Sequence, residues 1–178
     1  MSARTIENTS LTELTMSSLF RTTQDRQASV ALAIVRLLTG AIFMVHGAQK
    51  LFVFGFAGVS GAFAQMGVPM PGVIGPFIAL LEFFGGIALV FGLLTRLASL
   101  GLLFDMLGAI LLVHLKNGFF MPQGYEFALL LLGTTAALVV AGAGRFSLDN
   151  MLASRTTVTS GTARADEQAP TSKRRHAA

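Results

Sequence analysis

Residues 73–94 read VIGPFIALLEFFGGIALVFGLL, and their one charged side chain, Glu82, lies near the centre. A helix rises about 1.5 Å per residue, so this stretch is long enough to cross a hydrocarbon core of about 30 Å. An ionised carboxylate at mid-bilayer costs roughly 2.5–3.5 kcal/mol on insertion scales. Glu82 therefore needs a partner or a proton, and the rest of the chain has to supply it.

The overall composition is that of a membrane protein. Of the 178 residues, 53% are apolar and only 12% are charged, and the mean hydropathy is +0.67; a soluble domain carries about 25% charged residues. The absence of cysteine excludes disulfides, thiol catalysis and iron–sulfur clusters. The basic excess lies in the two tails and forms no basic face with interleaved aromatic residues, so we expect no nucleic-acid partner.

Three further apolar stretches predict membrane spans, at residues 28–51, 96–115 and 125–143. Four helices joined by short turns bury their polar faces most simply as an antiparallel bundle. Residues 52–72 are apolar but interrupted by glycine and proline, which predicts a loop containing a short interfacial helix near residues 59–66. The predicted fold is all-α: a four-transmembrane-helix antiparallel bundle with an interfacial helix in the first outer loop.

The tails differ from this membrane domain, which covers residues 28–149. Residues 1–27 are polar and lack the features of a cleaved signal peptide, and residues 150–178 are rich in threonine, serine and alanine and end with a basic run. We expect both tails to be disordered. The tails and the Thr95–Arg96 turn hold ten lysines and arginines, whereas the opposite loops hold Lys50 and Lys116. The positive-inside rule therefore predicts an inner-membrane protein with both termini in the cytoplasm.

Ionisable residues in the spans predict two polar clusters. On a helical projection Arg36 and Lys50 share one face of the first span, with His46 on its flank. From depths counted at about 1.5 Å per residue, we expect Arg36 to pair with Asp105, and Glu82 to pair with His46 and Lys50. The Arg36–Asp105 pair favours a structural role, whereas the Glu82 cluster fits head-group binding, proton relay or simple mutual neutralisation.

Two outer residues complete the candidate set. Glu126 lies at the start of the fourth span. It either joins the outer cluster, which consists of Glu82, His46 and Lys50, or lies at the outer rim of the bundle near Lys116. His114 lies about opposite Asp105 on its helix, and His46 has no second histidine at ligand spacing, so we predict no metal site.

An ordered series of motifs between residues 28 and 149 resembles the DoxX family. It comprises Arg36-x-x-x-Gly40, His46-Gly47-x-x-Lys50, Gly67-Val68-Pro69-x-Pro71, Glu82-x-x-Gly85-Gly86, Gly92-x-x-Thr95-Arg96, His114, Gly118-Phe119-Phe120, Glu126, and Gly142-Ala143-Gly144-Arg145-Phe146-Ser147-Leu148-Asp149. The resemblance implies a four-helix bacterial inner-membrane protein. The family takes its name from a subunit of a thiosulfate:quinone oxidoreductase, and relatives are associated with membrane complexes that handle thiol and oxidative stress.

Two functional hypotheses follow. In the first, the chain is the membrane subunit of a redox system for quinone-linked sulfur or thiol oxidation or oxidative-stress handling, in which His46, Lys50, Glu82 and Glu126 contact a quinone head group or small anion. Electrons would then pass to soluble oxidoreductase subunits or to the quinone itself. In the second, the chain is a non-catalytic scaffold or small transporter-like protein that recruits a soluble partner through its basic tails. The Gly85–Gly86 face suits homo-oligomerisation as well as internal packing.

Overall fold

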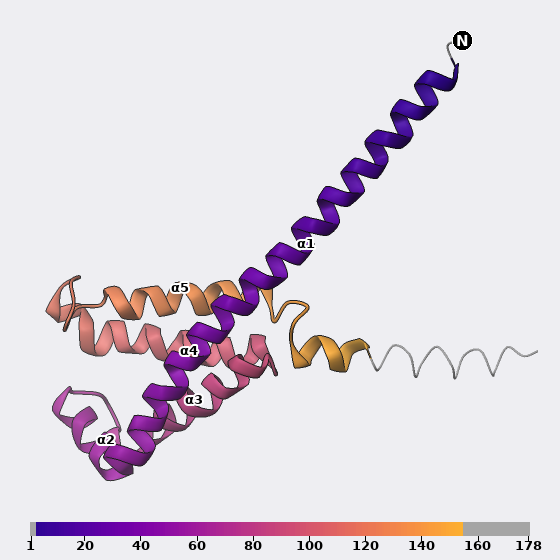
Figure 1. Ribbon diagram of the computed structural model, residues 1–178. Helices are drawn as coiled ribbons and strands as arrows, with labels where there is room; N and C mark the ends of the chain where they lie inside the picture. Colours follow the sequence, from indigo (N-terminus) through magenta and orange to yellow (C-terminus); the bar gives the residue numbers. More distant parts are fainter. Residues whose placement is uncertain (1–2, 155–178) are drawn as a thin grey trace, which may run out of the picture.

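The structure is a computed structural model that describes residues 3–154, with side chains from Asp25 onward. Every regular element in this range is helical, which confirms the all-α prediction. The elements, several of them labelled in Figure 1, are α1 (Ala3–Ala48), the π-helix η1 (Gln49–Phe54), α2 (Gly55–Gln65), α3 (Pro71–Phe91), α4 (Thr95–Ala109), the π-helix η2 (Ile110–His114), the 3₁₀-helix η3 (Leu115–Asn117) and α5 (Glu126–Ala141).

Three described helical segments are long and apolar enough to cross a membrane: Asp25–Gln65, Pro71–Phe91 and Thr95–Asn117. The apolar helix α5 is shorter. The stretch around Glu82 became α3, which has Pro71 at its first position and Gly92 as its left-handed C-cap (φ +66°). Helix α2 occupies the loop in which we expected a short helix.

The N-terminal segment differs from our expectation of a disordered tail over residues 1–27. Helix α1 begins at Ala3 and continues without interruption into the predicted first span, so it projects far beyond the other helices (Figure 1). Residues 3–39 contain neither glycine nor proline, so no helix breaker separates the polar segment from the apolar one. The expected disordered C-terminal tail lies almost entirely outside the described residues.

Glycines allow α1 and α3 to pack with their backbones close together. A Cβ atom added to Gly40 would lie 2.8 Å from the carbonyl oxygen of Gly86, and one added to Gly86 would lie 2.7 Å from the carbonyl oxygen of Gly40. A Cβ at Gly47 would overlap the backbone of Phe83. This contact sets the α1–α3 register and brings the end of α1 beside the middle of α3.

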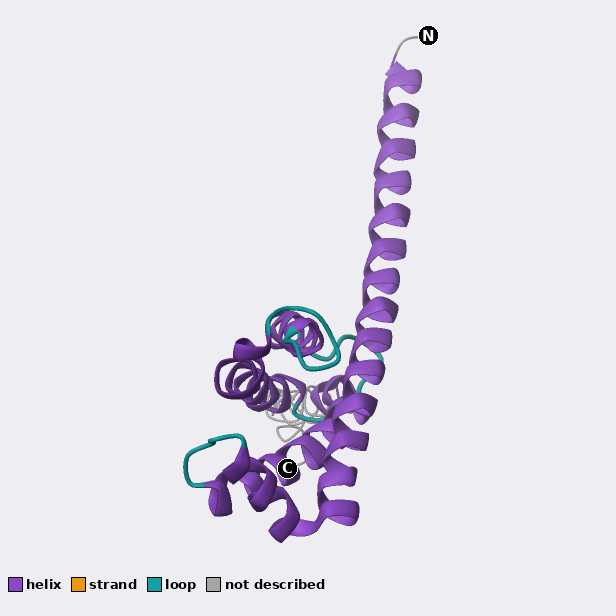
Figure 2. Cartoon of the chain, turned by 90° about the vertical axis from the view of Figure 1, so that its left-hand side faces the viewer, coloured by secondary structure: helices purple, strands orange, loops and turns teal. Residues whose placement is uncertain are grey.

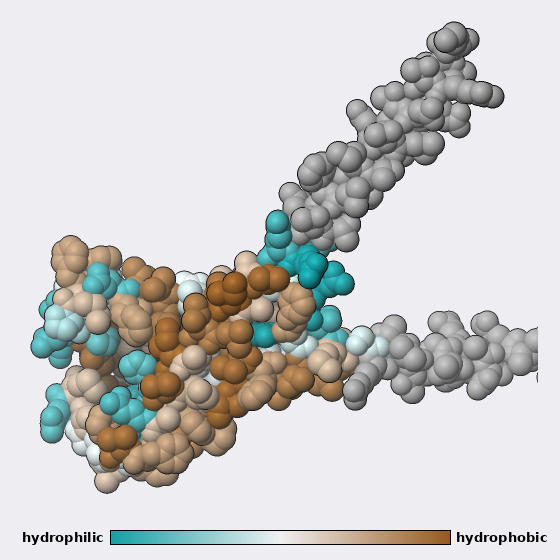
Figure 3. Space-filling model, viewed as in Figure 1, coloured by the Kyte–Doolittle hydropathy of each residue, from teal (hydrophilic) through white to brown (hydrophobic). Residues whose placement is uncertain are grey.

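Helices α4 and α5 run side by side in opposite directions and complete the body of the molecule (Figures 1 and 2). The core between the helices contains buried apolar residues from α1, α3, α4 and α5: Phe43, Leu89, Leu102, Met106, Leu131 and Leu138. Large apolar side chains also cover much of the outer surface (Figure 3), as expected for helices that contact lipid.

The segment after α5, which we call the closing segment (residues 142–150), folds back over one end of the bundle. Arg36 of α1 donates from Nη1 to the Ala143 carbonyl (2.9 Å) and from Nη2 to the Phe146 carbonyl (2.7 Å). The carboxylate of Asp149 accepts from the backbone N–H groups of Leu94 (2.7 Å) and Thr95 (2.9 Å). It thereby satisfies unpaired donors at the start of α4. The closing segment thus joins α1 to the α3–α4 turn.

Candidate functional site

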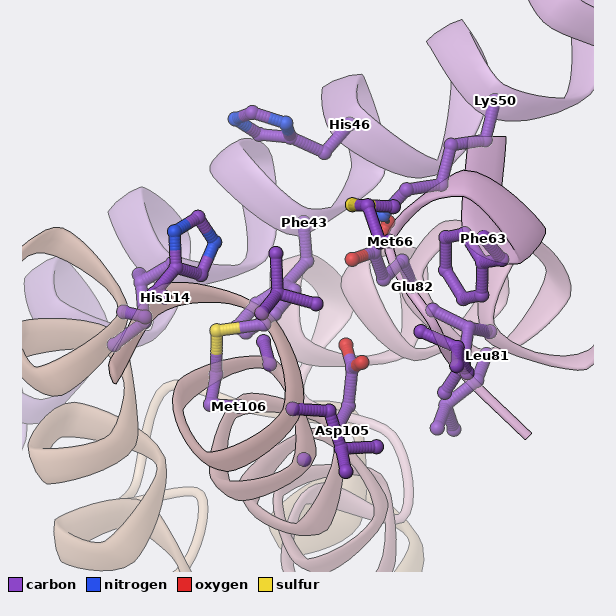
Figure 4. A pocket seen from close by; sticks show the side chains of 18 of the residues that line it. Phe43, His46, Lys50, Phe63, Met66, Leu81, Glu82, Asp105, Met106 and His114 are labelled. Atoms are coloured by element: carbon purple, nitrogen blue, oxygen red, sulfur yellow. Dashed lines mark hydrogen bonds and ion pairs between the residues drawn. The ribbon is translucent and has the colours of Figure 1, made fainter. Parts of the chain in front are cut away.

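A cavity of about 930 Å³ lies at the opposite end of the bundle, and its lining comes from α1, α2, α3, α4 and α5 and the segments between them. Most of the lining is apolar. Five ionisable residues contribute to it: His46, Lys50, Glu82, Asp105 and His114 (Figure 4). In Figure 3 the same end is hollowed between α2 and the ends of α4 and α5. The cavity therefore combines a mostly hydrophobic wall with a few polar groups, as small-molecule sites commonly do.

The side chains of Lys50 and Glu82 form an ion pair in this wall, which confirms one of the two partners that the sequence predicted for Glu82. His46, the other predicted partner, forms no ion pair with Glu82 among the described residues. Glu82 lies in the middle of α3 with its side chain only 5% exposed, whereas the Lys50 side chain is 21% exposed. Lys50 belongs to η1, where the helix widens after α1. Such π-helical turns are rare and occur frequently at functional sites. The ammonium group of Lys50 is the partner that the Glu82 carboxylate needs in the middle of an apolar helix.

Asp105 joins this pair, and the predicted Arg36–Asp105 pairing is wrong. Asp105 is 8% exposed and points into the cavity toward Glu82 (Figure 4), and its charge interacts with Glu82 and Lys50. Its Oδ2 atom is buried without a hydrogen-bond partner among the described residues. Arg36 is occupied at the closing segment instead, because the chain beyond α5 directs backbone carbonyls at its guanidinium group.

The two histidines lie on the cavity wall apart from the ion pair. The ring of His46 stands 6.3 Å from that of Phe127, tilted by 43°. His114, the last residue of η2, has its Nδ1 atom 2.9 Å from the Gln123 carbonyl oxygen. Because a carbonyl oxygen only accepts hydrogen bonds, Nδ1 is the donor in this contact. No group of three or more potential metal ligands occurs among the described residues.

Glu126 is not among the cavity-lining residues. Its Oε1 atom accepts a hydrogen bond from the Met121 backbone N–H (2.7 Å) and so holds the loop before α5 against the start of that helix. The Glu126 carboxylate is therefore engaged in the loop before α5 and does not belong to the cluster around Glu82, and its proposed association with Lys116 stays a prediction.

Sequence reasoning missed the aromatic part of the wall. Phe77 of α3 and Phe104 of α4 line the cavity and are 60% and 62% exposed. Gly108 also lines the cavity, and a Cβ atom added to it would meet nothing within 4 Å, so there is open space beside this part of α4. The sequence pattern contained no signal for either phenylalanine, and only the arrangement of α3 and α4 shows that both line the same cavity.

Comparison with known proteins identifies a matching family and several related proteins. Residues 31–115 match the DoxX family. A Bacillus subtilis protein named "Putative oxidoreductase CatD" is 32% identical over 126 residues, which cover 70% of this chain and 89% of that protein. The uncharacterized membrane protein Rv3486 of Mycobacterium tuberculosis is 34% identical over 134 residues, covering 69% and 82% of the two chains. The inner membrane protein YqjF of Escherichia coli is 32% identical over 128 residues, covering 69% and 92%.

No solved structure matches the chain. The family match spans α1 beyond its polar start, α2, α3 and α4, which between them supply Lys50, Glu82 and Asp105. Together with the relatives that extend over two thirds of the sequence, it shows that this integral membrane protein belongs to the DoxX family.

Proposed function

We propose that the chain is a four-span inner-membrane protein that binds a quinone in the cavity and acts as the membrane subunit of a redox system. In this arrangement α1, α3, α4 and α5 cross the bilayer and α2 lies at its outer interface. Lys50 and Lys116 are then on the outside, and the Thr95–Arg96 turn and the closing segment, which carries Arg145, are in the cytoplasm, as the positive-inside rule favours. The cavity consequently opens near the outer face.

The observation that carries this proposal is the Lys50–Glu82 ion pair beside Asp105 in a wall that is otherwise mainly apolar. A quinone presents two polar oxygens on a flat apolar ring. An ammonium group and carboxyl groups supply polar contacts for those oxygens, while the phenylalanine and methionine side chains of the cavity suit the ring.

The exposed wall supports a ligand that arrives from the bilayer. Phe77 and Phe104 line the cavity and are largely exposed, in a bundle whose surface is mostly apolar. We therefore propose that an apolar tail leaves the cavity past them and remains among lipid chains. A hydrophobic ring with a long apolar tail fits this arrangement better than a small water-soluble anion does.

A redox role also agrees with the name of one relative, because CatD carries the word oxidoreductase. We propose that electrons come from a soluble oxidoreductase partner, for which a quinone-binding membrane protein supplies the acceptor.

Purification of the full-length protein from bacterial membranes tests the proposal. We expect quinone in the lipid extract of the wild-type protein, at least tenfold less with Glu82→Gln, and wild-type content with Ser99→Ala. Ser99 is a matched control because it is buried in α4 and does not line the cavity. In membranes, Glu82→Gln should also slow quinone-dependent oxidation of thiosulfate or thiols. Wild-type protein that copurifies with a soluble oxidoreductase but without quinone would favour the scaffold function instead.

A further inference from the structure

Helices α3 and α4 pack together near the turn that joins them and separate farther along α4. A Cβ atom added to Gly85 of α3 would lie 3.3 Å from the Leu102 side chain, and one added to Gly101 of α4 would lie 2.9 Å from the Leu81 side chain. About two turns beyond Gly101, a Cβ at Gly108 would meet nothing within 4 Å. Residues a heptad apart lie on nearly the same face of a helix. This face of α4 therefore contacts α3 at Gly101 and has lost that contact at Gly108, and Figure 1 shows the two helices diverging from their turn.

The cavity extends into the gap between the diverging helices. Gly101 and Gly108 both line it, as do Phe77 of α3 and Phe104 of α4. The two phenylalanine side chains are largely exposed. Helix α2 packs against α3 but leaves the space beside Gly108 unfilled. The wall between α3 and α4 is therefore incompletely covered at the level of Gly108.

The two ways out of the cavity differ in polarity. Phe77, Ile78 and Phe104 make the sides of the α3–α4 gap apolar, and the backbone there is helical. The outer end is lined by His114 and by part of the irregular loop before α5. Irregular backbone carries polar groups that suit contact with water, whereas helix faces with apolar side chains suit contact with lipid. An apolar chain is therefore accommodated better in the α3–α4 gap than at the outer end.

We propose that the α3–α4 gap is a lateral entrance from the bilayer and that Gly108 sets its width. The ligand is then a quinone with an apolar tail, whose head group lies toward the Lys50–Glu82 pair and whose tail lies between Phe77 and Phe104. This inference rests on the proposed function, because it assumes that a quinone occupies the cavity. It adds the route of entry and a residue that determines which tails fit.

Substitution of Gly108 tests the width of the entrance. Full-length protein in lipid nanodiscs is titrated with decyl-ubiquinone and with its tailless parent, a dimethoxy-methyl-benzoquinone. In Gly108→Leu we expect the dissociation constant of decyl-ubiquinone to rise about tenfold, because the leucine side chain occupies the space of the tail. The value for the tailless compound should stay within about twofold of the wild type. Each ligand is compared between variants, so its partition into lipid cancels.

Gly133→Leu in α5 is the matched control. Its added Cβ would also meet nothing within 4 Å, but Gly133 is not among the cavity-lining residues, so both ligands should bind as to the wild type. Leucine is favoured over glycine in helices, and we expect neither variant to lower the unfolding temperature. Unchanged decyl-ubiquinone binding in Gly108→Leu, an equal loss of both ligands, or the same loss in Gly133→Leu overturns the inference while the quinone site stands. Binding of neither ligand by the wild-type protein removes the proposed function together with the inference.

A photoreactive ligand tests the route directly, including where the tailless compound binds too weakly to measure. Decyl-ubiquinone with a diazirine at the end of its tail is irradiated with the wild-type protein, and the labelled peptides are identified by mass spectrometry. We expect label on α3 and α4 that excess decyl-ubiquinone competes away, and less of it in Gly108→Leu. Competed label on α2 and the loop before α5 would show that the tail leaves through the outer end and would overturn the inference. Label that no excess ligand displaces would count against the quinone site itself.

Discussion

Lys50 and Glu82, which are 32 positions apart in the chain, meet in the wall of the cavity as an ion pair. The contact depends on two features of the backbone. Glycines let α1 approach α3 closely, and η1 then continues from the end of α1 past the middle of α3. The ionisable groups that make these helices costly to insert in lipid are thus the groups that the fold collects in one place.

Removal of Lys50 tests the energetic role of this pair. Lys50→Met leaves the two carboxyl groups of Glu82 and Asp105 without a cation, and we expect the stability of the protein to fall by about 3 kcal/mol. The double variant Lys50→Met/Glu82→Gln removes the uncompensated carboxylate and should be more stable than Lys50→Met alone. Thermal unfolding in detergent measures both effects.

Lys116→Met is the control for this comparison, because Lys116 is exposed in η3. We expect its stability to stay within about 0.5 kcal/mol of the wild type. If Lys50→Met is as stable as Lys116→Met, the ion pair contributes nothing to the fold.

The close approach of α1 to α3 predicts a large effect from a single methyl group. In Gly47→Ala the added Cβ would overlap the backbone of Phe83 and force the helices apart, so we expect a loss of about 2–3 kcal/mol and weaker quinone binding. Gly133→Ala in α5 is the matched control, because a Cβ there meets nothing within 4 Å. That change should be neutral or stabilise the helix by up to about 1 kcal/mol. Similar unfolding temperatures for the two variants would contradict the observed packing.

The closing segment predicts a structural role for Asp149. Asp149→Ala removes both acceptors at the start of α4, and we expect a loss of about 1–2 kcal/mol. Because this end is remote from the cavity, quinone affinity should remain within about twofold of the wild type, a change under 0.5 kcal/mol. Thermal unfolding and ligand titration of the same preparation give the two values. A large loss of affinity at unchanged stability would assign Asp149 a role that its hydrogen bonds do not explain.

The proposed orientation can be tested with introduced cysteines, since the natural sequence has none. Gln123→Cys, in the exposed loop before α5, should react with a membrane-impermeant maleimide in intact spheroplasts. Met151→Cys, exposed just beyond the closing segment, should react only after lysis. The reverse labelling pattern would place the cavity at the cytoplasmic end and overturn the predicted orientation.

The sequence alone determined the kind of structure and the presence of a buried polar site. Apolar stretches of membrane-spanning length predicted the long helices, and the breaks at glycine and proline located most of their ends, because span length and helix-breaking chemistry are local properties of the chain. Glu82 in the middle of one such stretch required a partner, and Lys50 was among the groups at a suitable depth.

Only the tertiary structure decided how the remaining ionisable groups pair. Counting residues gives the depth of Arg36 and Asp105 but neither the rotation of their helices nor the path of the chain beyond α5. The chain beyond α5 places the backbone carbonyls of Ala143 and Phe146 against the Arg36 guanidinium group. Asp105 therefore does not pair with Arg36 and lies near Glu82 instead. The cavity, its aromatic lining and the unpartnered carboxyl oxygen of Asp105 likewise arise from the packing of separate helices, a relationship between distant residues that no local pattern in the sequence contains.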